Sequence, residues 1–149
     1  MPVIGVTRFV RFFRIAAGLD IDKNDLKRYS DFVNDKIYDL LLMAQATAKA
    51  NSRDVIQPWD LPITKGLQES THRFRDLDEE IELRPILEMI AARPPLDAAL
   101  SDETTDRLPL IVGGLSLALA KAFTIIEPGV KQPATEEWER ARRTFDLLL

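Results

Sequence analysis

Apolar side chains recur every three to four positions in two long stretches of this chain, which is the spacing of one face of an α-helix. The first stretch predicts a helix of about 28 residues that begins after Asp22 and ends at Asn51. Asp22 can cap its N-terminus, and Asp25 lies in the first turn, where the helix dipole favours a carboxylate. The expected apolar face comprises Leu26, Tyr29, Val33, Ile37, Leu40, Leu41, Ala44 and Ala48.

The second long stretch lies in the other half of the chain, where Ser101 and Asp102 can cap a helix start. Pro109 requires that this helix either begins near residue 108 or is kinked there. Pro128 and Gly129 end the helix. Its expected apolar face comprises Leu108, Ile111, Val112, Leu115, Leu119, Ala122, Phe123 and Ile126.

Shorter amphipathic stretches flank both long helices. Residues 6–17 predict a first short helix, and Pro58 with Pro62 restricts the next helix to a start near residue 60. In the second half, residues 83–92 predict a short helix. The last helix is expected to start at a Thr135 cap and to bury Trp138, Ala141, Phe145 and Leu148.

Each half of the chain therefore has the order short helix, long helix, short helix. This order predicts an all-α fold with one internal duplication. The expected halves are residues 1–72 and 73–149, packed as one cooperative unit. A strongly acidic stretch near the middle is expected to form a solvated turn between the halves. It comprises Asp76, Asp78, Glu79, Glu80 and Glu82.

Composition removes several classes of function. The chain has 149 residues, no cysteine and one histidine, which excludes disulfide frameworks, thiolate nucleophiles and histidine-rich metal sites. The sequence contains no glycine-rich phosphate loop and no serine–histidine–aspartate set, so we expect neither an enzyme nor a cofactor or metal. No apolar stretch reaches the length of a membrane span, and arginines interrupt the apolar N-terminal segment. We therefore expect a cytoplasmic protein that has no membrane partner.

Three segments of the first half resemble the archaeal histones. Residues 2–11 are similar to the opening of that family, and residues 42–50 resemble the alanine-rich end of its long helix. Residues 53–61 resemble its junction pattern R-K-T-[IV]-x-x-x-D-[IVL]. The resemblance extends over residues 2–63 in sequence, and over residues 83–149 only in the order of helices.

The resemblance implies two tandem histone-fold-like units that pack head to tail as an intramolecular pseudo-dimer. Single-chain histone-fold doublets of this kind occur in bacteria and archaea. In histones, an arginine after the long helix forms a salt bridge to an aspartate seven positions later. Arg53 and Asp60 occupy these positions here, so the resemblance implies a structural salt bridge between them.

The resemblance also implies contacts with DNA through the first helix. Arg8, Arg11 and Arg14 lie there, in a segment of 19 residues without an acidic side chain. Because the net charge of the whole chain is −4, a nucleic-acid role requires such a local basic patch. The alternative for these arginines is a solvated face on a helix whose phenylalanines are buried.

The loops that bind DNA in histones are different in this chain. Asp20, Asp54 and Val55 stand where the family has two cations and a hydroxyl, and an acid near phosphates opposes binding. We therefore expect weak, non-specific association with double-stranded DNA, with the nucleoid as the location. The alternative is a protein–protein interaction module that does not bind DNA, and self-association of the chain stays open in both cases.

Four further positions carry structural expectations. Gly113 and Gly114 are expected to allow a close helix crossing. His72 is expected to face solvent in a polar connector, and Trp59 and Trp138 are expected to anchor packing at the start of the third helix of each half.

Overall fold

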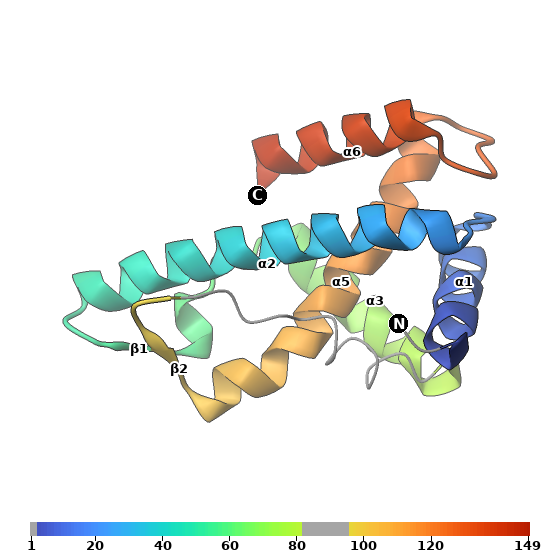
Figure 1. Cartoon of the computed structure of the whole chain (residues 1–149). Helices are drawn as coiled ribbons and strands as arrows, with labels where there is room; N and C mark the ends of the chain where they lie inside the picture. Colours follow the sequence, from blue (N-terminus) through green and yellow to red (C-terminus); the bar gives the residue numbers. More distant parts are fainter. Residues whose placement is uncertain (1–2, 82–95) are drawn as a thin grey trace.

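The fold is all-α, as predicted, and its only strands in the described residues are two short ones that pair with each other. The computed structural model describes residues 3–81 and 96–149, and Figure 1 shows the arrangement of the helices. The helix expected over residues 83–92 lies outside the described residues. The elements are α1 (Val3–Ala17), α2 (Lys23–Ala50), β1 (Val55–Ile56), the 3-10 turn η1 (Pro58–Asp60), α3 (Lys65–Ile81), β2 (Ala99–Leu100), α5 (Asp102–Ile126) and α6 (Thr135–Leu148).

The long helix α2 has the start and the apolar face that its sequence predicts. The Asp22 side chain accepts hydrogen bonds from the backbone N–H groups of Asn24 and Asp25, and the Asp25 carboxylate accepts one from the Asp22 N–H. This reciprocal arrangement satisfies backbone donors that have no partner within the helix. Seven of the eight predicted face residues are buried, and Leu26 is half-buried.

Aromatic rings fill the space between α1, α2 and α3. Phe9 contacts the ring of Tyr29 on α2 at a centroid distance of 4.4 Å, and Phe13 contacts the same ring at 5.8 Å. Phe12 reaches Phe74 on α3 at 5.9 Å. All five rings are completely buried, so the first helix is held to the core by its phenylalanines while its arginines point elsewhere.

Helices α3 and α5 cross closely at the two glycines, as predicted. A methyl group added at Gly113 would overlap the ring of Phe74, and one at Gly114 would overlap the Thr71 hydroxyl. Only a residue without a Cβ permits this approach of the two backbones. Pro109 lies inside α5, which begins at Asp102 with Ser101 as its N-cap, so a start near residue 108 is wrong.

The third helix begins later than predicted. Residues 58–60 form only a 3-10 turn, and Leu61 is extended because it precedes Pro62. The α-helix α3 then begins at Lys65 and continues to Ile81. The predicted acidic turn is therefore wrong over residues 76–81, which are helical, and the helix also passes through the junction expected between residues 72 and 73.

The two tryptophans have different environments, so the expectation of two packing anchors is half right. Trp138 is 6% exposed and its ring lies 4.8 Å from that of Phe123, whereas Trp59 is 71% exposed. The predicted Thr135 cap is also wrong, because Ala134 is the N-cap residue. The Thr135 hydroxyl instead accepts a hydrogen bond of 2.7 Å from the Arg28 guanidinium.

Two polar contacts, each with at least one buried partner, join α2 to helices that are far from it in the sequence. The Tyr29 and Ser116 hydroxyls are 2.5 Å apart, and burial of the phenol raises the pKa of Tyr29 above its ordinary value. Lys36 on α2 is 2% exposed and forms an ion pair with Asp146 on α6. Beside this pair, the rings of Phe32 and Phe145 are in contact, so α6 lies along α2 as Figure 1 shows.

Candidate functional site

The predicted pairing of Arg53 with Asp60 is present in the structure, at the junction between α2 and η1. The guanidinium donates two parallel hydrogen bonds to the carboxylate, at 2.6 Å and 2.7 Å. The Asp60 side chain is fully buried, and that of Arg53 is 30% exposed. The hydrogen bond from Arg53 and a further one from the Gln57 N–H lower the pKa of Asp60 against the opposing effect of burial. The pair therefore holds the loop in place and has no exposed reactive atom.

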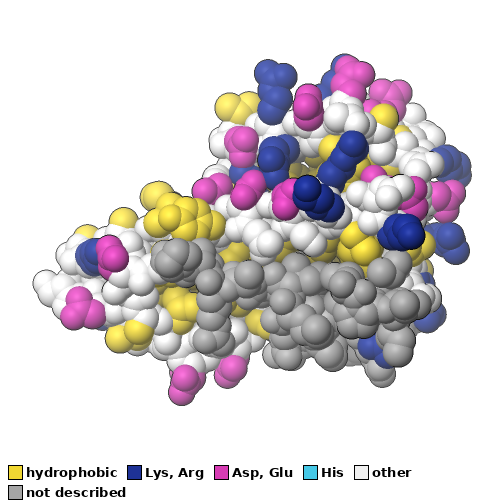
Figure 2. Space-filling model, viewed as in Figure 1, with side chains coloured by type: hydrophobic (Ala, Val, Ile, Leu, Met, Phe, Trp, Pro, Cys, Tyr) yellow, Lys and Arg dark blue, Asp and Glu magenta, His cyan; other side chains and the backbone are white. Residues whose placement is uncertain are grey.

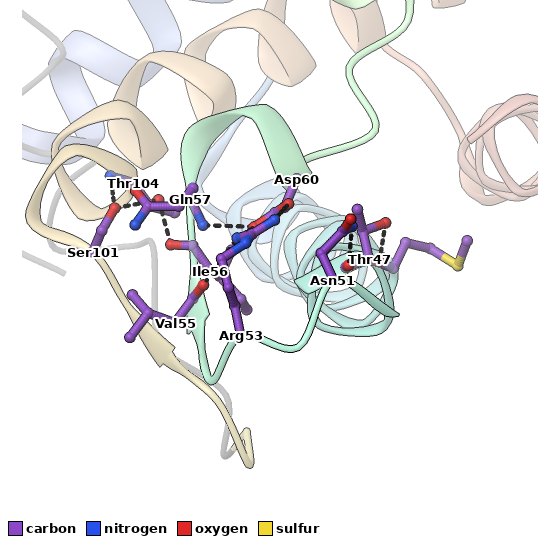
Figure 3. A network of polar contacts seen from close by, with 10 residues as sticks. Thr47, Asn51, Arg53, Val55, Ile56, Gln57, Asp60, Ser101 and Thr104 are labelled. Atoms are coloured by element: carbon purple, nitrogen blue, oxygen red, sulfur yellow. Dashed lines mark hydrogen bonds and ion pairs between the residues drawn. The ribbon is translucent and has the colours of Figure 1, made fainter. Parts of the chain in front are cut away.

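The strand that follows Arg53 joins the two halves of the chain. β1 and β2 pair in parallel, with Val55 opposite Ala99. The Thr104 hydroxyl, in the first turn of α5, donates to the Ile56 carbonyl at 2.8 Å, and Ser101 caps the same helix (Figure 3). The loop after α2 is thus attached to the segment that leads into α5.

A reciprocal connection exists at the other end of the molecule. The N–H of Asp20, in the loop before α2, donates to the carbonyl of Lys131, in the loop after α5, at 2.6 Å. Gln132 also donates to the Asp22 carboxylate at 3.4 Å. The loop before α2 is therefore paired with the loop after α5, and the loop after α2 is paired with the segment before α5.

The three candidate DNA-contacting arginines all lie on α1, but they are not equivalent. Arg11 is exposed, and Arg8 is half-buried and engaged in a contact of its own. Arg14 lies 3.5 Å from Asp20, in an ion pair whose two side chains are 65% and 62% exposed. Because both partners face solvent, this pair is weak and leaves Arg14 accessible.

The structure adds Lys131 to this group. Lys131 is exposed, and its carbonyl accepts the hydrogen bond from Asp20, whose carboxylate faces Arg14. We call Arg8, Arg11, Arg14 and Lys131 the basic end. Lys131 could not be added from the sequence, since it is far from the other three along the chain and only the loop pairing unites them.

The opposite loop pair has acidic character. Asp54 is exposed beside β1, and Lys49 is held by Asp97 at 3.4 Å. Asp102 and Glu103 begin the neighbouring helix. On the face in Figure 2, dark blue side chains lie at the α1 side and, mixed with magenta, over α2 and α6, whereas the tip near β1 and β2 shows yellow and magenta with little dark blue. The two ends therefore present different electrostatic potentials to a ligand.

The described residues contain no site for a metal ion. No group of three or more His, Cys, Asp or Glu side chains in that part of the chain is placed to hold one. Helix α5 is long and apolar enough to cross a membrane, but 61% of its most apolar window is buried within the protein. Such burial is typical of the central helix of a folded core.

Relatives of known structure share this fold over nearly the whole chain. A crystal structure of a Thermus thermophilus protein is 51% identical, covers 97% of both chains and superposes with a TM-score of 0.85. The crystal structure of protein AQ328 from Aquifex aeolicus is 26% identical, covers 97% of this chain and 95% of its own, and gives a TM-score of 0.84.

Sequence comparison also finds relatives that match most of the chain. Two proteins of Aquifex aeolicus (strain VF5), both described as uncharacterized, are 26% identical over 95% of this chain and 32% identical over 74% of it. These matches cover 82% and 71% of the respective relatives. The model of DUF1931, a domain of unknown function, matches residues 9–146, so the chain belongs to the DUF1931 family.

Proposed function

We propose that this protein is a histone-fold doublet that associates weakly and non-specifically with double-stranded DNA through its basic end. The doublet arrangement is supported by the two reciprocal loop pairings, Asp20 with Lys131 and β1 with β2. A head-to-tail pair of short–long–short units requires such a connection at both ends. The order of α1, α2 and α3 supplies one unit.

The DNA-associated role is carried by one observation, the gathering of basic side chains from two distant segments at the end of α1. Arg11, Arg14 and Lys131 are all exposed there. Cations placed together on a surface neutralise phosphates and release counterions, which supplies most non-specific affinity. The exposed acids Asp20 and Asp22 follow α1, and Asp20 pairs with Arg14, so the binding is expected to be weak.

The acidic end limits how DNA can lie on the protein. A histone-like path requires phosphates to pass both loop pairs, but Asp54 is exposed at the second pair and Lys49 is neutralised by Asp97. Repulsion at that end opposes a continuous path. The proposal is therefore a local contact at one end, without wrapping and without catalysis, by a cytoplasmic protein at the nucleoid.

The test is a fluorescence-anisotropy titration of duplex DNA at about 50 and 200 mM salt, over which phosphate contacts weaken strongly. With three to five phosphates neutralised, the slope of log K against log salt is expected to be roughly −3 to −4. The double variant Arg11→Ala/Arg14→Ala should abolish binding. The control Lys49→Ala/Lys65→Ala removes the same charge from exposed positions outside the basic end and should retain it.

Two results would overturn the DNA role. Absence of binding at the lower salt would leave only the alternative, a protein–protein interaction module. Tight binding that is insensitive to Arg11 and Arg14 would place the interface on another surface.

The alternative is favoured by apolar side chains exposed on and after the long helix α2. Met43 is 59% exposed, Trp59 is 71% exposed and Val55 is 38% exposed, the last beside the acidic residue Asp54. Exposed apolar groups with a polar surround are typical of protein interfaces. Pull-down from native lysate with and without nuclease separates the two functions, because only a protein partner survives nuclease treatment.

A further inference from the structure

A cleft with a volume of about 440 Å³ lies between η1, α3 and α5. Its polar lining comes from α3 and α5, and the indole of Trp59, which is 71% exposed, stands at its edge on η1. Apolar side chains complete the lining. The residues that matter for its chemistry are Trp59, Gln68, Thr71, His72, Arg75 and Arg107.

The charged residues that line this cleft are all basic. None of its lining residues is acidic. Among residues 7–78 and 96–149, whose side chains the structure describes, neither Arg75 nor Arg107 forms an ion pair or hydrogen bond with a carboxylate. Two guanidinium groups and one imidazole therefore line a space that an anion can enter, and guanidinium groups are suited to phosphate oxygens.

A second cleft in the molecule supplies an internal comparison. A smaller cleft of about 190 Å³ lies between α2 and α6, and its lining has the same spacing along both helices. Arg28, Asp31 and Phe32 repeat the intervals of Arg107, Leu110 and Ile111. On the second helix the intervals match as well, with Thr135, Trp138, Glu139 and Arg142 in one cleft and Gln68, Thr71, His72 and Arg75 in the other.

Both arginines of the smaller cleft are engaged by neighbouring side chains. Arg142 forms an ion pair with Asp35 at 2.8 Å, and Arg28 donates to Thr135 at 2.7 Å. The indole of Trp138 is buried there. In the larger cleft the small residue Thr71 occupies the position of that tryptophan. The two clefts therefore have the same arrangement of lining positions, but the one on α3 is larger and its lining contains no acidic side chain.

We propose that the larger cleft binds a nucleoside phosphate. Arg75 and Arg107 take the phosphate, with His72 beside them, and the base stacks on the exposed face of Trp59. Stacking on an aromatic side chain is tolerant of base identity, and the volume falls within the range of about 300–1,000 Å³ typical of small-molecule sites. The same chemistry is offered by a free mononucleotide and by one nucleotide of a single-stranded nucleic acid.

The site is separate from the basic end, and its test does not depend on the proposed function. The full-length protein is titrated with adenosine 5′-monophosphate, adenosine, inorganic phosphate and a single-stranded oligonucleotide by isothermal titration calorimetry. The monophosphate should bind saturably, and adenosine and inorganic phosphate should each bind at least about tenfold more weakly, since each lacks one of the two contacts.

Matched variants assign the site. Arg75→Gln/Arg107→Gln should weaken binding of the monophosphate at least about tenfold. The control Arg28→Gln/Arg142→Gln removes the same charge from the corresponding positions of the smaller cleft and should bind as the wild type does. Trp59→Ala should weaken binding, and Trp59→Phe should restore it. Circular dichroism confirms that each variant is folded.

Several results would overturn the proposal. These are the absence of saturable binding by the monophosphate and the oligonucleotide, equal losses in the two double-arginine variants, or binding of inorganic phosphate as tightly as the monophosphate. Binding of only the oligonucleotide, with the same loss on changing Arg75 and Arg107, supports the site and identifies nucleic acid as the source. Arg11→Ala/Arg14→Ala should leave binding of the monophosphate unchanged, which distinguishes this site from the basic end.

Discussion

Replacing Arg53 with alanine removes the only side chain that pairs with the buried Asp60 carboxylate among the described residues. Two charge-assisted hydrogen bonds are lost, and the hydrogen bond from the Gln57 N–H at 2.8 Å remains. Loss of one partner of a buried ion pair costs about 3–5 kcal/mol, because the other charge stays buried without compensation. Since 30% of the Arg53 side chain faces solvent, water can enter the vacated space, and we expect about 2–4 kcal/mol.

The assay is equilibrium unfolding in urea, followed by far-ultraviolet circular dichroism, for Arg53→Ala, Asp60→Ala and the double variant. Asp60→Ala should cost a similar amount, and the double variant should cost less than the sum of the two. Additive costs would show that the two residues do not interact. A cost below about 1 kcal/mol for Arg53→Ala would place the pair among exposed ion pairs and refute the argument from burial.

The same pair predicts a pH dependence of stability. The hydrogen bonds from Arg53 lower the pKa of Asp60 in the folded state, whereas an aspartate in the unfolded chain has a pKa of about 3.9. The stabilisation is therefore fully present above the unfolded pKa and is lost as the pH falls through the lowered folded pKa. The difference in unfolding free energy between wild type and Asp60→Asn should be constant near neutral pH and should shrink at acidic pH. An unchanged difference across the acidic range would contradict the assignment.

Four further substitutions test the packing and the electrostatics. Gly113→Ala should destabilise the fold by about 1–3 kcal/mol or more in urea unfolding, because the methyl group overlaps the buried ring of Phe74; a stabilised variant would show that the two helices do not cross there. Trp138→Ala should cost about 3–5 kcal/mol and Trp59→Ala less than about 0.5, since only the first indole is buried; equal costs would contradict this difference. Asp54→Lys should strengthen binding of duplex DNA in the anisotropy assay, because it removes repulsion at the acidic end; unchanged affinity would show that DNA does not approach that end.

Local signals were sufficient to predict the long helices. The Asp22 cap and the three-to-four spacing of apolar residues determine α2 without help from other parts of the chain. The glycines at 113 and 114 were also interpreted correctly, since small residues inside a long apolar helix require a close neighbour. The pairing of Arg53 with Asp60 came from the resemblance to histones, because seven positions across a loop do not by themselves define a contact.

The third helix was predicted less well because its sequence is dominated by charge. α3 buries Leu67 and Phe74, while most of its other described side chains are exposed or half-buried. A narrow apolar stripe is enough for a helix that packs on one neighbour, so the density of acidic residues near its end indicated a turn where the helix in fact continues. The sequence predicts that Trp59 packs against the core, because large aromatic residues are usually buried. In the structure Trp59 lies in the 3-10 turn after Pro58 and is exposed.

The candidate sites depend on contacts that the sequence does not encode locally. Lys131 joins Arg14 only through the pairing of two loops, and Arg75 joins Arg107 only because α3 crosses α5. The equal spacing of the residues that line the two clefts is present in the sequence, but the sequence does not show that these residues line clefts. That spacing supports the proposed internal duplication.

The central claim is that the two halves form one cooperative unit in which neither half is stable alone. Native-state hydrogen exchange measured at increasing urea tests it most directly, because it gives the opening free energy of each helix separately. The slowest amides of α2 (Lys23–Ala50) and α5 (Asp102–Ile126) should converge on a single free energy with the same dependence on urea. Distinct free energies for α2 and α5 that stay separate up to the unfolding transition would show two independent halves and would contradict the doublet.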